Sequence, residues 1–237
     1  TRALTDVSFD QFPTEEAFAM VTMMPYDDRF DVPTVFDQQR VDDTLGELVA
    51  GNGLRQLRLS ESQKEPHVTY FFDGQREARP DNTDVQIFDS ADVSAYDEKP
   101  EMEAAAITGR AVEAMEQGEY GFVFINYPNC DLVGHTGDVD AAVDAVEVVD
   151  GAAGRLADAA VANGYALILT SDHGTCEEME GTYATSHTLN NVPFCIVSDR
   201  AVPPLGEGGI SNIAPTVLEL LGIPSADDMD DALFSRR

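Results

Sequence analysis

Residues 121–137 read GFVFINYPNCDLVGHTG. The apolar run from Gly121 to Ile125 predicts a buried strand, and the Asn, Pro and Gly residues that follow it are typical of a loop. Asp131 and His135 lie four residues apart, so on a helical turn they face the same way and can hold one ion together. In α/β sheets ligands collect beyond the carboxyl ends of the strands, so this stretch predicts both a sheet and a site.

Two later stretches carry the same kinds of residue. TSDHGT at 170–175 directly follows a second apolar run and contains Asp172 and His173, and ATSHT at 184–188 contains His187. Each histidine taken alone is more often structural, but all of these side chains stand in loop sequence beside Gly, Thr or Ser. Asp and neutral His are ligands of the kind that hold Mn, Zn or Fe. We therefore expect these residues to build a two-metal site for phosphoryl chemistry.

Strands and helices alternate along most of the chain. Strands are expected at residues 54–59, 85–88, 121–125, 165–169 and 192–197. Helices are expected from Asp42 or Asp43 to Gly51, from Pro66, from Pro100 past Met115, from Asp138 or Asp140 past Leu156, and from Ile213 to Leu221. The expected inner face of the longest helix is marked by Val143, Val146, Val149 and Leu156. This alternation predicts an α/β fold with a largely parallel sheet flanked by helices.

The first 38 residues lack this regularity. Residues 17–24 read AFAMVTMM, an apolar run typical of one strand, and residues 25–33 are polar and bounded by prolines, as in a linker. One strand cannot form a domain, so its sheet is expected elsewhere. We expect residues 1–38 to end one domain and residues 39–237 to form another.

The chain carries a large excess of acidic residues. It has 14 basic and 44 acidic residues, a net charge of −30, and only two lysines, Lys64 and Lys99. Such a field repels nucleic acid and anionic membranes, so neither is expected as a partner. The acidic residues are spread along the chain, as on a solvated surface, and the scarcity of lysine indicates adaptation to high salt. No apolar run approaches the roughly 18 residues that a membrane span needs.

Three cysteines, Cys130, Cys176 and Cys195, form no CxxC pair. An odd number of cysteines and the lack of a signal peptide predict a reduced, cytoplasmic protein. Cys195 lies in an apolar stretch and is expected in the core. Cys130 and Cys176 lie close in sequence to the expected ligands, where a thiolate ligand is the lesser alternative.

Lys64 stands at the predicted start of a helix, where phosphate oxygens are well received. A solvated lysine is the ordinary interpretation, but this surface otherwise avoids lysine. His67 follows Pro66 and precedes an aromatic run, so we expect it to serve helix packing rather than ligand binding.

At these residues the chain resembles the cofactor-independent phosphoglycerate mutases, which belong to the alkaline-phosphatase-like metalloenzymes. Residues 126–137 resemble that family's Asn-x-x-Asn-x-Asp-x-Val-Gly-His-Thr-Gly motif, and residues 170–174 and 186–188 resemble its other metal motifs. Residues 54–58 and 64–72 resemble its phosphate-side segment. The likeness runs over nearly the whole chain, and the motifs are long, ordered and specific.

The resemblance implies an alkaline-phosphatase-like fold and the interconversion of 3-phosphoglycerate and 2-phosphoglycerate through a phosphoserine. It implies two divalent metals, Mn first, with Mg, Zn or Co as alternatives. The implied ligands are, for the first metal, Asp131, His135 and His187, and, for the second, Asp172 and His173. Lys64 is implied to contact the transferring phosphoryl group. Two cations that stabilise the attacking and leaving oxygens suit such an in-line transfer.

Several positions depart from the family pattern. Cys130 stands where the family usually has proline, Glu65 where it has an aromatic residue, and residues 189–191 replace the usual Thr-Asn-Pro. The family's serine nucleophile and a further aspartate ligand lie in an N-terminal segment that is not found in this sequence. The chain therefore resembles the C-terminal half of such an enzyme, with residues 1–38 as the last piece of the transferase domain. We expect it to need the missing N-terminal portion as a partner and to be inactive alone.

Two other interpretations stay open. The chain could be another alkaline-phosphatase-like enzyme, a phosphopentomutase or a phosphatase, although the Lys64 segment favours phosphoglycerate as the substrate. It could instead be a non-catalytic, metal-stabilised module that works with a partner chain, since no nucleophilic serine is recognised. Ser171 and Ser186 are candidate nucleophiles, but each is more simply a loop residue beside a ligand.

Overall fold

The computed structural model describes residues 20–25, 32–38 and 40–235. The chain divides into two compact units, Thr1–Val41 and Asp42–Arg237. In the described part of the first unit, Thr22 and Thr34 form an isolated parallel bridge. The strand expected at residues 17–24 is therefore wrong for its described part, and its first three residues lie outside the described ones. The assignment of residues 1–38 to the end of another domain stays a prediction.

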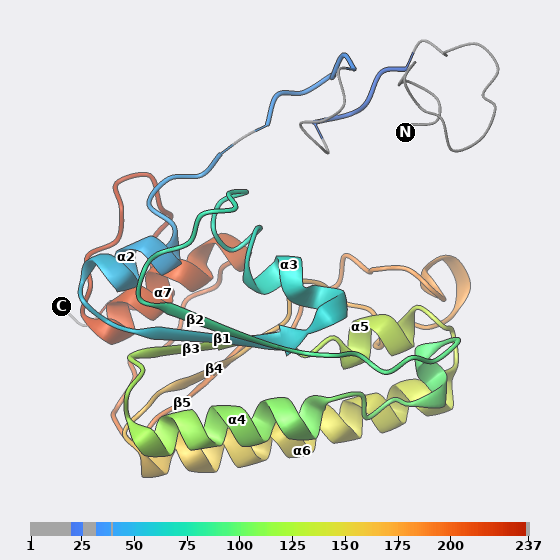
Figure 1. Cartoon of the computed structure of the whole chain (residues 1–237). Coiled ribbons are helices and arrows are strands. Elements are labelled where there is room, and N and C mark those ends of the chain that lie inside the picture. The colour runs from blue at the N-terminus through green and yellow to red at the C-terminus, as the bar shows by residue number, and fades with distance from the viewer. Residues whose placement is uncertain (1–19, 26–31, 39, 236–237) are drawn as a thin grey trace. The chain divides into compact units, whose positions relative to one another are not determined.

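A three-stranded parallel sheet organises the second unit (Figure 1). Its strands are β1 (Gln56–Glu61), β2 (Thr83–Phe88) and β3 (Phe122–Ile125), in the order β2-β1-β3. All six residues of β1 are buried, because a neighbour lies on each edge and helices cover both faces. The carboxyl ends of β1 and β3 therefore meet at one edge, and the chain continues there into short helices.

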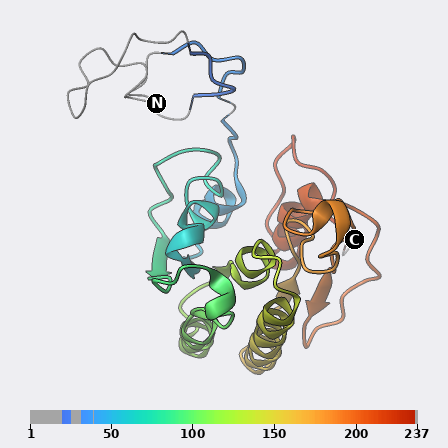
Figure 2. The same ribbon diagram turned by 90° about the vertical axis from the view of Figure 1, so that its right-hand side faces the viewer.

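Two long helices, α4 (Ala104–Gln117) and α6 (Val139–Ala162), lie side by side under one face of the sheet, as the end-on view in Figure 2 shows. The opposite face is covered by α2 (Leu45–Gly51), α7 (Ile213–Leu221) and the single-turn helix α3 (Glu65–Val68). A further short helix, α5 (Asn129–Gly134), follows β3. The α/β fold with a parallel sheet flanked by helices is thus confirmed. None of the helices that the structure describes combines the length and apolar character that a membrane crossing needs.

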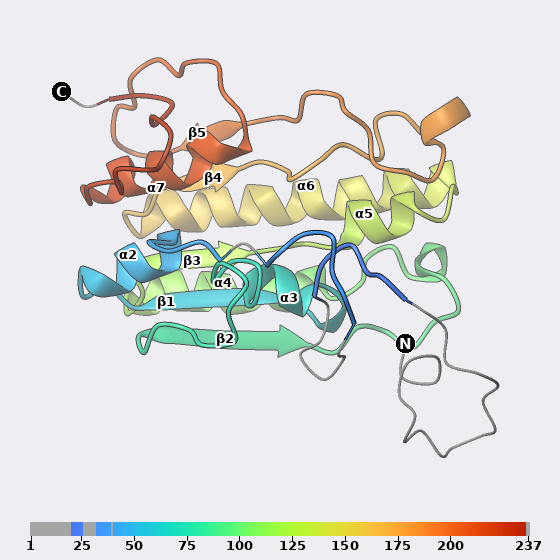
Figure 3. The ribbon, with the colours of Figure 1, turned by 90° about the horizontal axis from the view of Figure 1, so that it is seen from above.

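The last two strands differ from the expected continuation of the parallel sheet. β4 (Leu167–Leu169) and β5 (Cys195–Val197) form a separate antiparallel pair, which lies beyond β3 in Figure 3. Parallel neighbours need a crossover that returns the chain to the starting edge. Residues 170–194 contain only the short 3-10 turn η3 (Gly181–Tyr183) and no such crossover helix, so β5 runs back beside β4.

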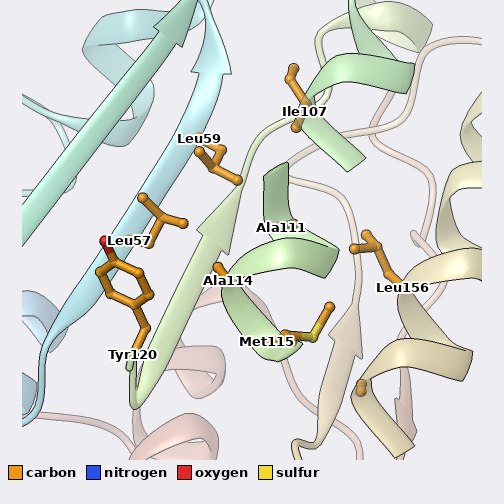
Figure 4. Close-up of a cluster of buried hydrophobic side chains, with 9 residues drawn as sticks. Leu57, Leu59, Ile107, Ala111, Ala114, Met115, Tyr120 and Leu156 are labelled. Carbon is orange, nitrogen blue, oxygen red and sulfur yellow. The ribbon is translucent and has the colours of Figure 1, made fainter. Parts of the chain in front are cut away.

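The main core lies between β1 and the two long helices (Figure 4). Leu57 and Leu59 of β1 pack with Ile107, Ala111 and Met115 of α4 and with Leu156 of α6. The face of α6 was predicted incorrectly, because Val143 and Val146 are about half exposed. Its buried positions are instead mostly alanines, namely Ala141, Ala142, Ala145, Ala152 and Ala160, beside Leu156. Small side chains let α6 approach α4 and α5 closely, which valines at these positions would prevent.

Two helix starts also differ from expectation. α2 begins after Thr44, whose hydroxyl accepts from the backbone N–H of Glu47 while the Glu47 carboxylate accepts from Thr44, so Asp42 and Asp43 do not cap it. α4 begins at Ala104 rather than at Pro100, because residues 100–103 form turns. Remaining short 3-10 turns are η1 (Ser62–Lys64), η2 (Tyr96–Glu98) and η4 (Ile210–Asn212).

Candidate metal centre

Three strand ends deliver the candidate residues. β1 runs through η1 to Lys64 at the start of α3, and β3 runs into α5, whose first turn holds Asp131 and whose C-cap is His135. β4 leads into the loop with Asp172 and His173. The parallel arrangement of β1 and β3 explains why residues more than 60 positions apart meet at one edge.

The Asp131 carboxylate is the hub of the centre. Its Oδ1 lies 3.1 Å from Nε2 of His135 and 3.0 Å from Nε2 of His187, and the two Nε2 atoms lie 3.1 Å apart. An ion about 2.1 Å from each of its ligands holds neighbouring ligands about 3.0 Å apart when they subtend a right angle. The three atoms therefore have the spacing of three ligands of one ion.

The hydrogen bonding of His135 also favours a metal ligand at this position. Its Nδ1 lies 2.9 Å from the backbone carbonyl of Thr185, which can only accept, so Nδ1 carries the proton. In the neutral ring Nε2 then carries no proton and can only accept a hydrogen bond. This nitrogen faces an Asp131 oxygen that is also an acceptor. Two acceptors at hydrogen-bond distance repel each other unless a proton or a metal cation lies between them, and a ring whose Nδ1 is bonded to a carbonyl has the orientation that histidine ligands of metals show.

His173 approaches the same Asp131 oxygen from a greater distance, and Asp172 lies beside His173. Nε2 of His173 is 3.8 Å from Asp131 Oδ1 and 3.6 Å from Asp172 Oδ1, and the His173 ring stacks on His187 with centroids 3.5 Å apart. Asp131, His173 and His187 also form a group whose candidate ligand atoms all lie within 4.8 Å of one another. The structure thus brings together all five residues that the sequence singled out as ligands.

A carboxylate that the sequence reasoning missed joins the two loops of the centre. Glu177 accepts from the backbone N–H of Thr175 at 2.7 Å and from the hydroxyl of Thr188, next to His187. Gly174 and Thr188 form an antiparallel bridge at the same point, and a Cβ on Gly174 would collide with the Glu177 carboxylate. The available signal was a further acidic residue shortly after His173, but nothing in the sequence shows which loop it joins.

Lys64 bonds to the oxygen of Asp131 that the histidines leave free, with Nζ 2.5 Å from Oδ2. Burial opposes ionisation of Asp131, but the hydrogen bond and charge of Lys64, together with the nearby histidines, hold the pKa of this carboxyl below its usual range. Asp131 is therefore ready to act as an anionic ligand near neutral pH.

His67, on the turn after Lys64, packs edge-on against Phe71 with ring centroids 5.4 Å apart, as its expected packing role requires. Burial and the charge of Lys64 lower its pKa, while Asp172 and Asp131 oppose the change. Of the two candidate nucleophiles, Ser171 donates its hydroxyl to the His173 carbonyl at 2.6 Å, which fits a loop-forming role. A pocket of about 200 Å³ opens beside Asp131, Asp172 and His173.

Comparisons with known proteins identify the family of the chain. The family model of the metalloenzyme superfamily matches residues 19–225. The chain belongs to the metalloenzyme superfamily. It is 42% identical over 217 residues to a 2,3-bisphosphoglycerate-independent phosphoglycerate mutase of Wolinella succinogenes, a match that covers 90% of this chain and 44% of the relative. The corresponding protein of Salinibacter ruber is 41% identical, with 97% of this chain and 45% of the relative covered.

A solved structure of a phosphoglycerate mutase from Leishmania mexicana superposes with a TM-score of 0.83 at 33% identity, and the match covers 98% of this chain and 47% of that one. The chain therefore spans about half the length of the relatives that it matches. The chain is thus a member of the metalloenzyme superfamily that is similar to these mutases over nearly its whole length.

Proposed function

We propose that this chain is the metal-binding part of a 2,3-bisphosphoglycerate-independent phosphoglycerate mutase, which interconverts 3-phosphoglycerate and 2-phosphoglycerate. The observation that carries the proposal is the convergence of one carboxylate oxygen and two imidazole nitrogens at 3.0 to 3.1 Å. The relatives that share this name over nearly the whole chain support the choice of reaction.

We assign two divalent metals to the centre. Asp131, His135 and His187 hold the first, and Asp172 and His173 contribute to the second, whose remaining ligands come from outside this chain. Mn is the metal we favour, and Co is a supported alternative because the Leishmania mexicana enzyme was crystallised at low cobalt concentration. When bound, the two cations would neutralise charge on the oxygens of a phosphoryl group in transfer.

The chain's own residues then have distinct roles. The Thr185 carbonyl fixes the ring of His135, and the hydrogen bonds of Glu177 hold the loops of His173 and His187 together. Lys64 has three donors on Nζ, of which Asp131 takes one, so two remain for oxygens of the phosphoryl group. The nucleophilic serine is proposed to come from the missing N-terminal portion. A cytoplasmic location and adaptation to high salt stay predictions.

The proposal is tested by assaying conversion of 3-phosphoglycerate with Mn present, first with this chain and then with the chain joined to the N-terminal portion of such an enzyme. We expect no turnover from the chain alone and Mn-dependent turnover from the joined protein, because the nucleophile and half of the substrate site are then supplied. Turnover by the chain alone, or none by the joined protein with both metals bound, would contradict the proposal.

The same samples test the ligands. Asp131→Asn removes the negative charge at the hub and should abolish turnover together with one equivalent of bound Mn. Asp138→Asn is the matched control, because Asp138 caps α6 through its side chain and asparagine caps equally well. An unchanged metal stoichiometry in Asp131→Asn would overturn the ligand assignment without touching the choice of reaction.

A further inference from the structure

Two of the three cysteines meet beside the metal centre although they lie far apart in the sequence. Cys130 is in the first turn of α5, directly before Asp131, and Cys176 follows His173 in the loop after β4. The thiol of Cys176 donates to the backbone carbonyl of Cys130 at 3.0 Å, and both cysteines line the same pocket. One cysteine thus sits on each of two segments that carry candidate ligands.

The surroundings leave this pair accessible to a small molecule. Both side chains are only partly buried, and both line the pocket of about 200 Å³ that Asp131 and His173 also line. The Cys176 sulfur lies against α5, since a Cβ on Gly134 would be 3.2 Å from it. Cys195, in contrast, is exposed on β5, so its expected place in the core is wrong, and it belongs to neither segment.

We propose that Cys130 and Cys176 form a peroxide-sensitive dithiol, whose oxidation to a disulfide weakens metal binding at the neighbouring centre. One thiol attacks the O–O bond of hydrogen peroxide, gives a sulfenic acid and releases one water. The second thiol attacks that sulfur, forms the S–S bond and releases a second water. Two thiols and one peroxide thus yield one disulfide and two waters, and a thiol reductant reverses the change.

The effect on the centre follows from geometry. A disulfide holds its sulfur atoms about 2.05 Å apart with a preferred torsion, so forming it removes the bond from the Cys176 thiol to the Cys130 carbonyl and ties α5 to the loop after β4. Metal ligands tolerate displacements of only about 0.2 Å from their ideal distances. Asp131 follows Cys130 directly, so movement of Cys130 displaces the hub. This inference concerns the chain itself and does not require the mutase reaction.

The experiment uses the full chain in a Cys195→Ser background, which removes the exposed thiol and leaves the pair. Free thiols are counted before and after exposure to hydrogen peroxide, the disulfide is located by peptide mapping, and Mn affinity is measured by titration in both states. We expect two thiols to be lost from monomeric protein and Mn affinity to fall about ten-fold or more. Dithiothreitol should restore both.

Cys176→Ser is the matched control, because serine keeps a donor for the Cys130 carbonyl but cannot form the bond. Its Mn affinity should match that of the reduced parent and should not change with peroxide. Retention of both thiols in the parent, or a disulfide that joins two chains, would overturn the dithiol. A mapped Cys130–Cys176 disulfide with unchanged Mn affinity would overturn its effect on the metal centre.

Discussion

Two polar clusters lie at β1, one buried around Arg58 within the strand and one partly exposed beyond its carboxyl end, and they satisfy their charges in opposite ways. In the first, Arg58 is fully buried and all five of its N–H groups find acceptors. Two bonds go to the Asp73 carboxylate, two to the Gln56 side chain and one to the Val68 carbonyl. The guanidinium also lies over the ring of Phe72, 4.7 Å from its centroid. This cluster is complete without any ligand.

At the metal centre, in contrast, acceptor atoms outnumber the donors that the chain supplies. Oδ1 of Asp131 faces nitrogen atoms of three histidines, and a neutral His135 with its proton on Nδ1 makes one of these contacts acceptor to acceptor. Lys64 is bonded to the other carboxylate oxygen and does not enter the triangle of Asp131, His135 and His187. The comparison teaches that the first cluster serves the fold, whereas the second holds a place for cations that the chain does not itself supply.

Breaking the complete cluster should have the largest effect on folding. Asp73→Ala leaves the Arg58 guanidinium buried without a counter-charge, so we expect a loss of about 3–5 kcal/mol in the free energy of unfolding. Urea denaturation in molar KCl measures it. Asp84→Ala is the matched control: Asp84 pairs with Arg55 at 2.7 Å but is half exposed, and its loss should cost about 1 kcal/mol or less. Equal losses in the two variants would show that burial of the pair does not matter.

The Glu177 carboxylate, which joins the loops of His173 and His187, should contribute less to the free energy of unfolding and more to metal affinity. Glu177→Gln keeps the size of the side chain but turns one acceptor into a donor that faces either the Thr175 N–H or the Asn190 side-chain N–H, both of which can only donate. We expect a 10–100-fold loss of Mn affinity, about 1.4–2.7 kcal/mol, measured by titration.

Glu180→Gln is the matched control for this joint, because Glu180 is exposed three residues later and its side chain caps no helix. It should bind Mn as the parent does. If Glu177→Gln also keeps the parent affinity, the loops hold their ligands without this carboxylate, and Glu177 has no positioning role.

The sequence predicted which candidate ligands meet at the sheet edge better than it predicted the residues that support them. Asp131, His135 and His173 follow predicted strands within loop sequence, so their position at the sheet edge is a consequence of the α/β topology. Glu177 and Arg58 carry no such signal. Their roles depend on partners brought close only by the tertiary fold, Thr188 for one and Asp73 for the other.

The errors in the helices have a similar physical origin. Hydrophobicity ranks valine above alanine, but the close approach of α6 to its neighbours selects small residues, so Val143 and Val146 face outward. Three possible caps stand in a row before α2, and only the reciprocal bonds between Thr44 and Glu47 decide among them. The spacing of apolar residues thus predicted that these helices exist, but it did not predict which face packs or which residue caps.

The smallest predicted effect on stability concerns Glu61, which is fully buried at the carboxyl end of β1, between the Arg58 cluster and the metal centre. Burial raises the pKa of Glu61, although its Oε1 accepts from the Glu103 N–H at 2.8 Å and this bond lowers it. The raised pKa means that the stabilising neutral form is present at low pH and is lost as pH rises through the folded-state value.

Glu61→Gln keeps an acceptor and removes the charge, so it should be up to about 1 kcal/mol more stable than the parent at pH 7. Thermal melting across pH should show this gain fading below the ordinary glutamate pKa of 4.5, whereas the exposed Glu98→Gln should show none. A gain that persists at low pH would mean that it does not come from removing a buried charge at Glu61.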